Sequence, residues 1–287
     1  MQSNALDVRV TELPLGVETR NADSMKMNRL IPMLPVKSMP ASVDFYCKML
    51  GFEVEKRNDD WGWAMLRFDE CRLMVDQSIN ARPGTPRDSI LYLYPDDIAE
   101  YHNQVRANGL AVPELEVTFY GLTEFRINDP DGNRLWIGQD TSLDGSKHAH
   151  RNELHVSNIE RLLPILVCED IPAAHDFLVD AFGFSSGGIH RTPEGQAVHA
   201  EVRAGDFVIW LHRVAADLKL ASPHSMPAAT SGLVVYVDDV DAHYARARAR
   251  GARPESEPKD MPYGQREYGV SDREGHRWWF AGCVTPK

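Results

Sequence analysis

The stretch YGLTEFRINDPDGNRLWIG, residues 120–138, occurs twice in this chain of 287 residues. It returns 143 positions later as YGQREYGVSDREGHRWWFA, residues 263–281, with seven of its nineteen positions identical. An internal repeat of this kind indicates a duplicated structural unit. The sequence therefore predicts two copies of one architecture in a single polypeptide.

The similarity between the copies extends upstream of this stretch. Val43-Asp44-Phe45-Tyr46 matches His175-Asp176-Phe177-Leu178 at an offset of 132 residues, and Asp96-Asp97-Ile98 matches Asp238-Asp239-Val240 at an offset of 142. Different loop lengths account for the change in offset, and each copy is close to the usual size of one domain. The predicted organisation is an N-terminal extension over residues 1–26, a first domain over 27–139, a linker over 140–160 and a second domain over 161–283.

Within each copy the pattern of apolar residues and helix signals predicts a strand, a helix and three strands, and then the same order again. In the first copy an apolar strand at residues 30–36 precedes an amphipathic helix at 41–50, which Gly51 ends. A second helix begins after Asp96-Asp97 and ends at Gly109. The sequence thus predicts an α+β fold built from four βαβββ modules.

Composition limits the kinds of partner. Hydrophobic residues make up 43% of the chain, which suits a globular protein with a substantial core. The 31 basic and 42 acidic residues give a net charge of -11, which disfavours nucleic acid or an anionic membrane as a partner and accommodates a cationic or neutral ligand. The four cysteines show no CxxC spacing, and we expect neither a membrane span nor an export signal. These features predict a cytoplasmic protein with reduced thiols.

The motifs carry a family resemblance. SVDFYCKMLGFEV at residues 42–54, VYVDDVDAHYARARARGA at 235–252 and the repeated stretch resemble the vicinal oxygen chelate superfamily, which includes glyoxalase I, extradiol dioxygenases and bleomycin resistance proteins. The resemblance implies two glyoxalase-like domains whose curved, mostly antiparallel sheets hold a small molecule. Because one fold of this type hosts many chemistries, the residues of the site must decide the function.

The resemblance also implies three metal-binding positions in each copy, at which enzymes of this superfamily have His, Gln or Glu. In this chain the first-strand, second-module and last-strand positions fall on Ile31 and Leu163, Ile90 and Gly232, and Trp136 and Trp279. None of these side chains can coordinate a hard or borderline cation. We therefore predict no metal site and no cofactor.

Alternation along each strand separates the side chains that face the helices from those that face a cavity. It predicts an aromatic cavity wall in the first copy and a more polar wall in the second. The predicted ligand-binding residues are Trp61, Trp63, Arg67, Tyr92, Glu124, Arg126 and Trp136 in the first copy, and Trp210, Tyr236, Glu267 and Trp279 in the second. The alternative interpretation is that these aromatic rings pack against the other copy.

The second copy also contains the candidates for catalysis, His199, Glu201 and His212. A hairpin turn at Ala204-Gly205 would place His199 opposite Trp210 and diagonal to His212. Two imidazoles and a carboxylate could perform acid–base chemistry, or they could hydrogen-bond a ligand. By contrast, His243 is expected on the solvated face of an arginine-rich helix.

These observations favour a metal-independent small-molecule-binding protein similar to the bleomycin resistance proteins, with a cationic or aromatic organic ligand. The two fused copies are expected to form a pseudo-dimer within the chain, as a monomer or a homodimer. An alternative is a lyase, an isomerase or another enzyme of the superfamily that acts in the second domain. A structural or partner-binding role with a collapsed cavity is the third hypothesis.

Overall fold

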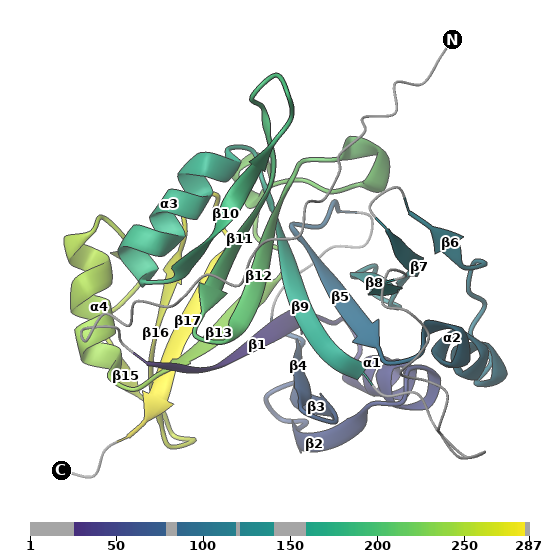
Figure 1. The fold of residues 1–287 in the computed structure, drawn as a ribbon. Helices are drawn as coiled ribbons and strands as arrows, with labels where there is room; N and C mark the ends of the chain where they lie inside the picture. Colours follow the sequence, from purple (N-terminus) through teal and green to yellow (C-terminus); the bar gives the residue numbers. More distant parts are fainter. Residues whose placement is uncertain (1–25, 79–84, 119–120, 141–158, 285–287) are drawn as a thin grey trace.

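In the computed structural model, which describes residues 26–78, 85–118, 121–140 and 159–284, the strands form two mixed sheets (Figure 1). Sheet I has the strand order β14-β16-β17-β13-β1-β4-β3-β2, with β15 paired to β16, and sheet II has the order β10-β11-β12-β9-β5-β8-β7-β6. The strands of sheet I are β1 (Met27–Pro35), β2 (Glu53–Asn58), β3 (Trp63–Phe68), β4 (Cys71–Asp76), β13 (Gly232–Val237), β14 (Arg253–Pro254), β15 (Lys259–Asp260), β16 (Gln265–Ser271) and β17 (Arg277–Cys283). The strands of sheet II are β5 (Ser89–Pro95), β6 (Glu116–Val117), β7 (Leu122–Asn128), β8 (Arg134–Asp140), β9 (Ile159–Cys168), β10 (Ser185–Arg191), β11 (Ala197–Ala204) and β12 (Phe207–Arg213).

The order of helices and strands confirms the predicted α+β class and the four βαβββ modules. Asp97 and Asp239 begin helices because their side chains accept hydrogen bonds from the backbone N–H groups of Glu100 and Ala242. The helices are α1 (Met39–Asp44), which continues as a π-helical segment (Phe45–Met49), α2 (Ile98–Ala107), α3 (Ile171–Phe182) and α4 (Val240–Ala249).

Parts of the predicted extension and linker lie outside the described residues, including His148, His150 and His155 of the linker. Where the chain is described, β8 continues to Asp140 and β9 begins at Ile159. The two ends of the segment predicted as a linker therefore belong to strands.

The two copies exchange modules between the sheets. Sheet I joins the first module of the first copy to the second module of the second copy, through the antiparallel pair β1 and β13. Sheet II joins the other two modules, through the antiparallel pair β5 and β9. Each sheet is therefore shared between the copies, which are arranged as a pseudo-dimer within one chain.

The helix-side cores, unlike the sheets, consist mainly of residues from single copies, with Met27 and Leu30 of β1 and Ile159 of β9 joining the core of the other copy. Helices α1 and α2 pack with strands of both sheets around the buried first-copy residues Tyr46, Tyr101 and Phe125. Helices α3 and α4 do the same in the second copy, on the opposite side of the molecule (Figure 1). Separate apolar clusters cover the face of each sheet that carries no α-helix, which we call its helix-free face. On sheet II this cluster includes Leu220, and Leu218 of a short 3₁₀ helix (Ala216–Leu218) packs against it.

His243 lies in the second of these cores, so the prediction of a solvated position is wrong. The side chain is 0% exposed, and its ring nitrogens lie 2.6 Å from the Tyr268 hydroxyl and 3.0 Å from the Phe182 carbonyl oxygen. Burial lowers the pKa of His243 to about 4. The imidazole is thus a neutral core group that joins α4 to β16 and α3.

The turn within each repeated stretch connects the two sheets. In the first copy Asp129 accepts a hydrogen bond from the Tyr46 hydroxyl at 3.0 Å, and Asp131 accepts one from the Ser42 hydroxyl at 3.0 Å. In the second copy the Glu274 carboxylate accepts from the backbone N–H groups of Glu169 and Asp170 at the start of α3. The turn of a second module is thereby attached to the first module of the same copy, which lies in the other sheet. This structural role explains why the stretch occurs in both copies.

The hairpin between β11 and β12 contacts the start of β1, and this contact leads to a stability prediction. Gly205 has φ +65°, and a Cβ there would overlap the Met27 carbonyl oxygen. Gly205→Ala is expected to lower the free energy of unfolding by about 2 to 4 kcal/mol, from backbone strain and overpacking together. The matched control is Gly195→Ala, since Gly195 has φ +88° but no atom within 4 Å of its Cβ position. Denaturant unfolding of both variants tests the prediction, and equal losses would contradict it.

Candidate ligand-binding face

The helix-free face of sheet II brings together predicted residues from both copies. Antiparallel pairing of β5 with β9, and parallel pairing of β9 with β12, places the two sets on one surface. The predicted residues on this face are Tyr92, Glu124, Arg126 and Trp136 from the first copy, and His199, Glu201, Trp210 and His212 from the second. The prediction of a separate wall in each copy is wrong, because the copies exchange modules.

Aromatic rings from both copies meet at the centre of this face. Tyr92 stacks on Tyr94, with ring centroids 4.6 Å apart and an interplanar angle of 25°. Trp210 of the second copy meets Tyr92 edge-on at 6.1 Å, and Trp136 meets it at 6.2 Å from the other side. Tyr92 is 1% exposed and Trp136 is 9% exposed, whereas Trp210 is half-buried. Trp210 is therefore the ring of this group with the most surface for a ligand, and edge-on ring pairs of this kind hold it in place.

Carboxylates and guanidinium groups on this face are paired with one another. The buried Glu124 accepts hydrogen bonds from the Tyr92 hydroxyl and from Arg126, both at 2.6 Å. The Arg126 guanidinium also lies 3.9 Å from the centroid of the Trp136 ring. In the second copy Glu201 accepts from Arg203 at 2.8 Å and from the Trp210 indole at 3.3 Å. Each carboxylate thus has an arginine partner from its own strand.

Gly138 makes room for this arrangement. A Cβ at Gly138 would overlap the Tyr92 hydroxyl and lie 3.0 Å from the Glu124 Cβ. The glycine near the end of the first repeated stretch therefore permits the buried hydrogen bond between Tyr92 and Glu124.

Three histidines form a row across the second-copy strands of this face. His190 on β10 pairs with His199 on β11, and His199 pairs with His212 on β12. The predicted register is therefore wrong: Ala204 pairs with Phe207, so the turn is one residue later than predicted and His199 lies opposite His212. Each residue of β11 therefore pairs with a β12 residue two positions later than predicted. Because two residues are one full side-chain period, every side chain keeps its predicted face. The His199 and Trp210 rings remain neighbours, with centroids 5.2 Å apart.

Burial controls the protonation of two of these histidines. Burial, reinforced by His190 and His212, lowers the pKa of His199 to about 4. Burial also lowers the pKa of His212, against the opposing effect of its hydrogen bond to the Arg213 carbonyl. Both imidazoles are therefore neutral near pH 7.

Two residues of this face were not predicted. His190 lies 5.7 Å from His199 between ring centroids, and the Arg161 guanidinium lies 4.4 Å from the centroid of Tyr94. Alternation would have found Arg161, since it lies two residues before Leu163 on β9. Alternation is less reliable for His190, because register shifts in the pairing of β10 with β11 interrupt the regular order of its side chains.

The helix-free face of sheet I carries the remaining predicted residues except Trp61. Its apolar centre consists of Ile31, Met33, Met65, Met74, Val234 and Ala281. Trp63, Tyr236 and Trp279 pack against this centre. Arg67 pairs with Glu53 at 2.5 Å, and Glu267 accepts a hydrogen bond from the Tyr263 hydroxyl at 2.6 Å.

Trp61, predicted as a ligand-binding residue of a cavity wall, does not belong to a strand. It is 54% exposed in the turn before β3, and its ring contacts Tyr263 of the second copy with centroids 5.7 Å apart. Trp61 and Tyr263 therefore form an exposed contact between loops of the two copies.

The positions at which the superfamily binds metal hold no suitable donors. On sheet II Leu163 pairs with Tyr92, and Tyr92 pairs with Trp136. On sheet I the corresponding row is Ile31, Val234 and Trp279. The middle residues of the two rows are Tyr92 and Val234. Each lies two residues after the predicted second-module position, Ile90 or Gly232, and on the same face of its sheet.

The chemistry of these two rows does not fit a divalent metal. The one hydroxyl in them, that of Tyr92, donates to Glu124. Nor do three His, Cys, Asp or Glu side chains converge as metal ligands elsewhere among the described residues. We therefore assign no step of any reaction to a metal at these rows.

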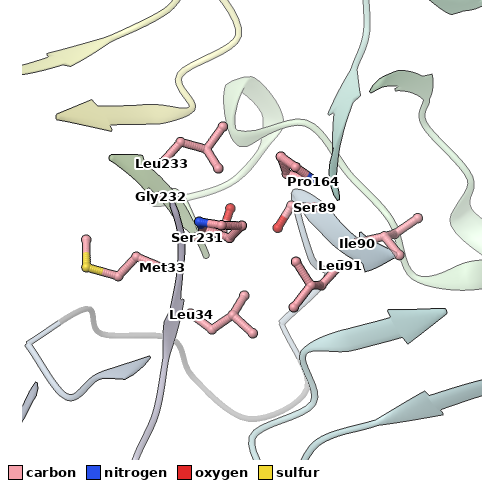
Figure 2. Close-up of a pocket in the computed structure, with 10 residues that line it drawn as sticks. Met33, Leu34, Ser89, Ile90, Leu91, Pro164, Ser231, Gly232 and Leu233 are labelled. Atoms are coloured by element: carbon pink, nitrogen blue, oxygen red, sulfur yellow. The ribbon is translucent and has the colours of Figure 1, made fainter. Parts of the chain in front are cut away.

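A small pocket lies between the sheets rather than on either helix-free face (Figure 2). Residues of all four apolar clusters border it, including Met33, Leu34, Ile90 and Leu233. Related residues of the two copies also face each other here, such as Ser89 and Ser231. The pocket therefore marks the centre of the pseudo-dimer.

Comparison with solved structures shows the fold. Glyoxalase I from Zea mays is similar over 90% of this chain and 92% of its own, with a TM-score of 0.63 and 12% identity. A putative dioxygenase from Bacillus subtilis is similar over 91% of this chain and 86% of its own, with a TM-score of 0.60 and 13% identity. Within the described residues, no helix combines the length and apolarity needed to cross a membrane.

Comparison of sequences gives the family. An uncharacterized protein of Mycobacterium tuberculosis is 31% identical over 138 residues, which cover 47% of this chain and 81% of the relative. An uncharacterized protein of Mycobacterium bovis is 33% identical over 125 residues, which cover 42% of this chain and 82% of the relative. The model of the Glyoxalase/Bleomycin resistance protein/Dioxygenase superfamily matches residues 27–137 and again residues 155–280. The chain is a member of this superfamily and contains its unit twice.

Proposed function

We propose that this protein binds a small planar organic molecule on the helix-free face of sheet II, without a metal. The observation that supports this most directly is the row Leu163, Tyr92 and Trp136, where apolar and aromatic side chains replace metal ligands. Next to this row, Trp210 and the imidazoles of His199 and His212 keep part of their surface exposed. The row itself is buried in one apolar cluster with Leu220, so the contact surface would be the partly exposed rim around Trp210. Aromatic side chains with a few polar groups are the composition typical of a binding site for an organic ligand.

The charges on this face favour a neutral aromatic ligand over a cationic one. Glu124 and Glu201 each pair with an arginine. Arg126 and Arg161 lie over the rings of Trp136 and Tyr94, the positions that a ligand cation would take. A cationic ligand would therefore have to displace the chain's own guanidinium groups. Retention of such a molecule, as in resistance by sequestration, requires no reaction.

Titration with 2-naphthol, a planar aromatic probe, tests this proposal. In buffer with EDTA we expect saturable binding by calorimetry, and at least tenfold weaker binding by Trp210→Leu, because a large aromatic contact is lost. Trp61→Leu is the matched control, since Trp61 lies in a loop next to sheet I and should leave the affinity unchanged. Binding that requires added metal, or equal binding by both variants, would contradict the proposal.

The histidine pair supports a second candidate function, an acid–base enzyme such as an isomerase or a lyase. His199 and His212 are direct cross-strand partners, and Glu201 lies two residues from His199 on the same face. Groups of this kind can move protons within a bound molecule. Recovery of a chemically altered ligand by mass spectrometry, abolished in His199→Ala, would favour the enzyme; recovery of unchanged ligand favours binding alone.

A further inference from the structure

The histidine row presents imidazole nitrogens that have no hydrogen-bond partner among the described residues. The Nδ1 atom of His212 lies 2.7 Å from the Arg213 carbonyl oxygen. Because a carbonyl only accepts hydrogen bonds, Nδ1 carries the proton of the neutral ring and Nε2 carries the lone pair. His212 is therefore fixed as a hydrogen-bond acceptor toward the helix-free face.

These nitrogens are also accessible. Among the described residues, the buried side-chain atoms that lack a hydrogen-bond partner are Arg87 Nη1, Asn133 Oδ1, Arg134 Nε and His276 Nε2. No atom of His199 or His212 belongs to this group, although each ring is partly buried. Their nitrogens without a partner are therefore not buried. The Nε2 atom of His212 and the nitrogens of His199 thus reach solvent beside the exposed part of Trp210.

The row is separate from the positions where the superfamily binds metal. His212 pairs with Val167 on β9, and Leu163 lies four residues earlier on that strand. Four residues of a strand span roughly 13 Å. Trp210 and His212 are only two residues apart on β12, roughly 7 Å. A molecule that reaches from Trp210 to His212 would therefore have the dimensions of a small fused-ring compound.

The surroundings of the row disfavour an anionic group at this end of a ligand. The nearby Arg126 is engaged by Glu124 and by the Trp136 ring. Arg203 is engaged by Glu201. The charge of the neighbouring Arg213 also acts on His212. A carboxylate at His212 would still place its oxygens against the lone pair of Nε2, whereas a neutral hydroxyl or ring N–H would donate to it.

We infer that His212 selects the hydrogen-bond donor of the ligand, so that the ligand is a planar aromatic molecule with a neutral hydroxyl or ring N–H. The aromatic part lies against Trp210, and the donor reaches Nε2 of His212. This inference rests on the proposed function and adds the chemical class of the ligand to it.

Three probes with one ring system test the inference: 2-naphthol, 2-methoxynaphthalene and 2-naphthoate. At pH 7.5 we expect 2-naphthol to bind about tenfold more tightly than 2-methoxynaphthalene, which cannot donate, and 2-naphthoate to bind no better than the ether. His212→Phe should abolish the preference, so that 2-naphthol and its ether bind with equal affinity. His212→Gln, whose amide oxygen accepts, should restore part of the preference, and the exposed His224→Phe is the control.

The outcomes separate the inference from the proposed function. Equal binding of 2-naphthol and its methyl ether, or tighter binding of 2-naphthoate, would overturn the donor assignment and leave aromatic binding intact. A preference for 2-naphthol that persists in His212→Phe would also overturn it. Failure of every probe to bind the folded wild-type protein would contradict the proposed function itself. Circular dichroism and melting curves of each variant show whether the fold is retained.

Discussion

Replacing Asp88 with alanine is expected to lower the free energy of unfolding by about 3 kcal/mol. Asp88 is 0% exposed, and its carboxylate accepts hydrogen bonds from the Thr230 backbone N–H at 2.6 Å and from the Ser231 hydroxyl at 2.7 Å. Thr230 and Ser231 are themselves buried, so the variant leaves two donors without an acceptor, each costing roughly 1 to 3 kcal/mol. The effect should be large because these bonds join the two copies next to the central pocket.

Chemical denaturation measures this change directly. A loss of this size corresponds to a fall in melting temperature of roughly 6 to 12 °C for a chain of this size class. Asp206→Ala is the matched control, since Asp206 is exposed in the turn between β11 and β12 and should change the stability by less than about 0.5 kcal/mol. Equal losses in the two variants would show that the bonds between the copies contribute little.

His276 is expected to make the stability depend on pH. Burial opposes its protonation, but the nearby Asp272 carboxylate, 3.1 Å from Nδ1, together with Asp88 and Glu274, raises the pKa of His276 to about 9. A pKa that is higher in the folded state stabilises the protein fully below the unfolded pKa near 6.5, and this stabilisation is lost as the pH rises through about 9. The loss should amount to roughly 3 kcal/mol.

His276→Asn isolates this contribution. At the equivalent position of the first copy, Asn133 donates to Asp129 at 2.7 Å, so asparagine suits this turn without titrating. Urea unfolding from pH 6 to pH 10 should show the wild type losing roughly 3 kcal/mol relative to the variant. Parallel stability curves for the two proteins would mean that His276 is neutral in the folded state.

Local patterns predicted the elements and the orientation of their side chains. Leu91, Phe125 and Leu135 lie in the helix-side core of the first copy, as alternation indicated, and Val202, Leu211 and Phe280 lie in that of the second. Such predictions succeed because the side-chain period of a strand is a property of its own backbone. They also tolerate the displaced β11–β12 register, since a shift of two residues preserves the face.

The neighbours of each strand could not be predicted in this way. An apolar strand such as β1 could pair with the second module of its own copy or with that of the other copy, and the two copies are similar enough that sequence pattern does not distinguish them. The structure selects β13 for β1 and β9 for β5. This choice moves Tyr92 and Trp136 next to Trp210, and it separates them from Trp63, which lies on sheet I.

The repeated stretch, the four modules and the apolar residues at the metal positions are encoded locally, and they establish the fold class and the absence of suitable metal donors at those positions. The composition of the candidate site is a property of the tertiary structure. Its aromatic residues and its histidines come from different copies, and they meet because sheet pairing depends on backbone hydrogen bonds that any strand can offer. The long-range contacts of the whole molecule, including those of Asp88 and of the two repeated turns, select one pairing among those that the local sequence permits.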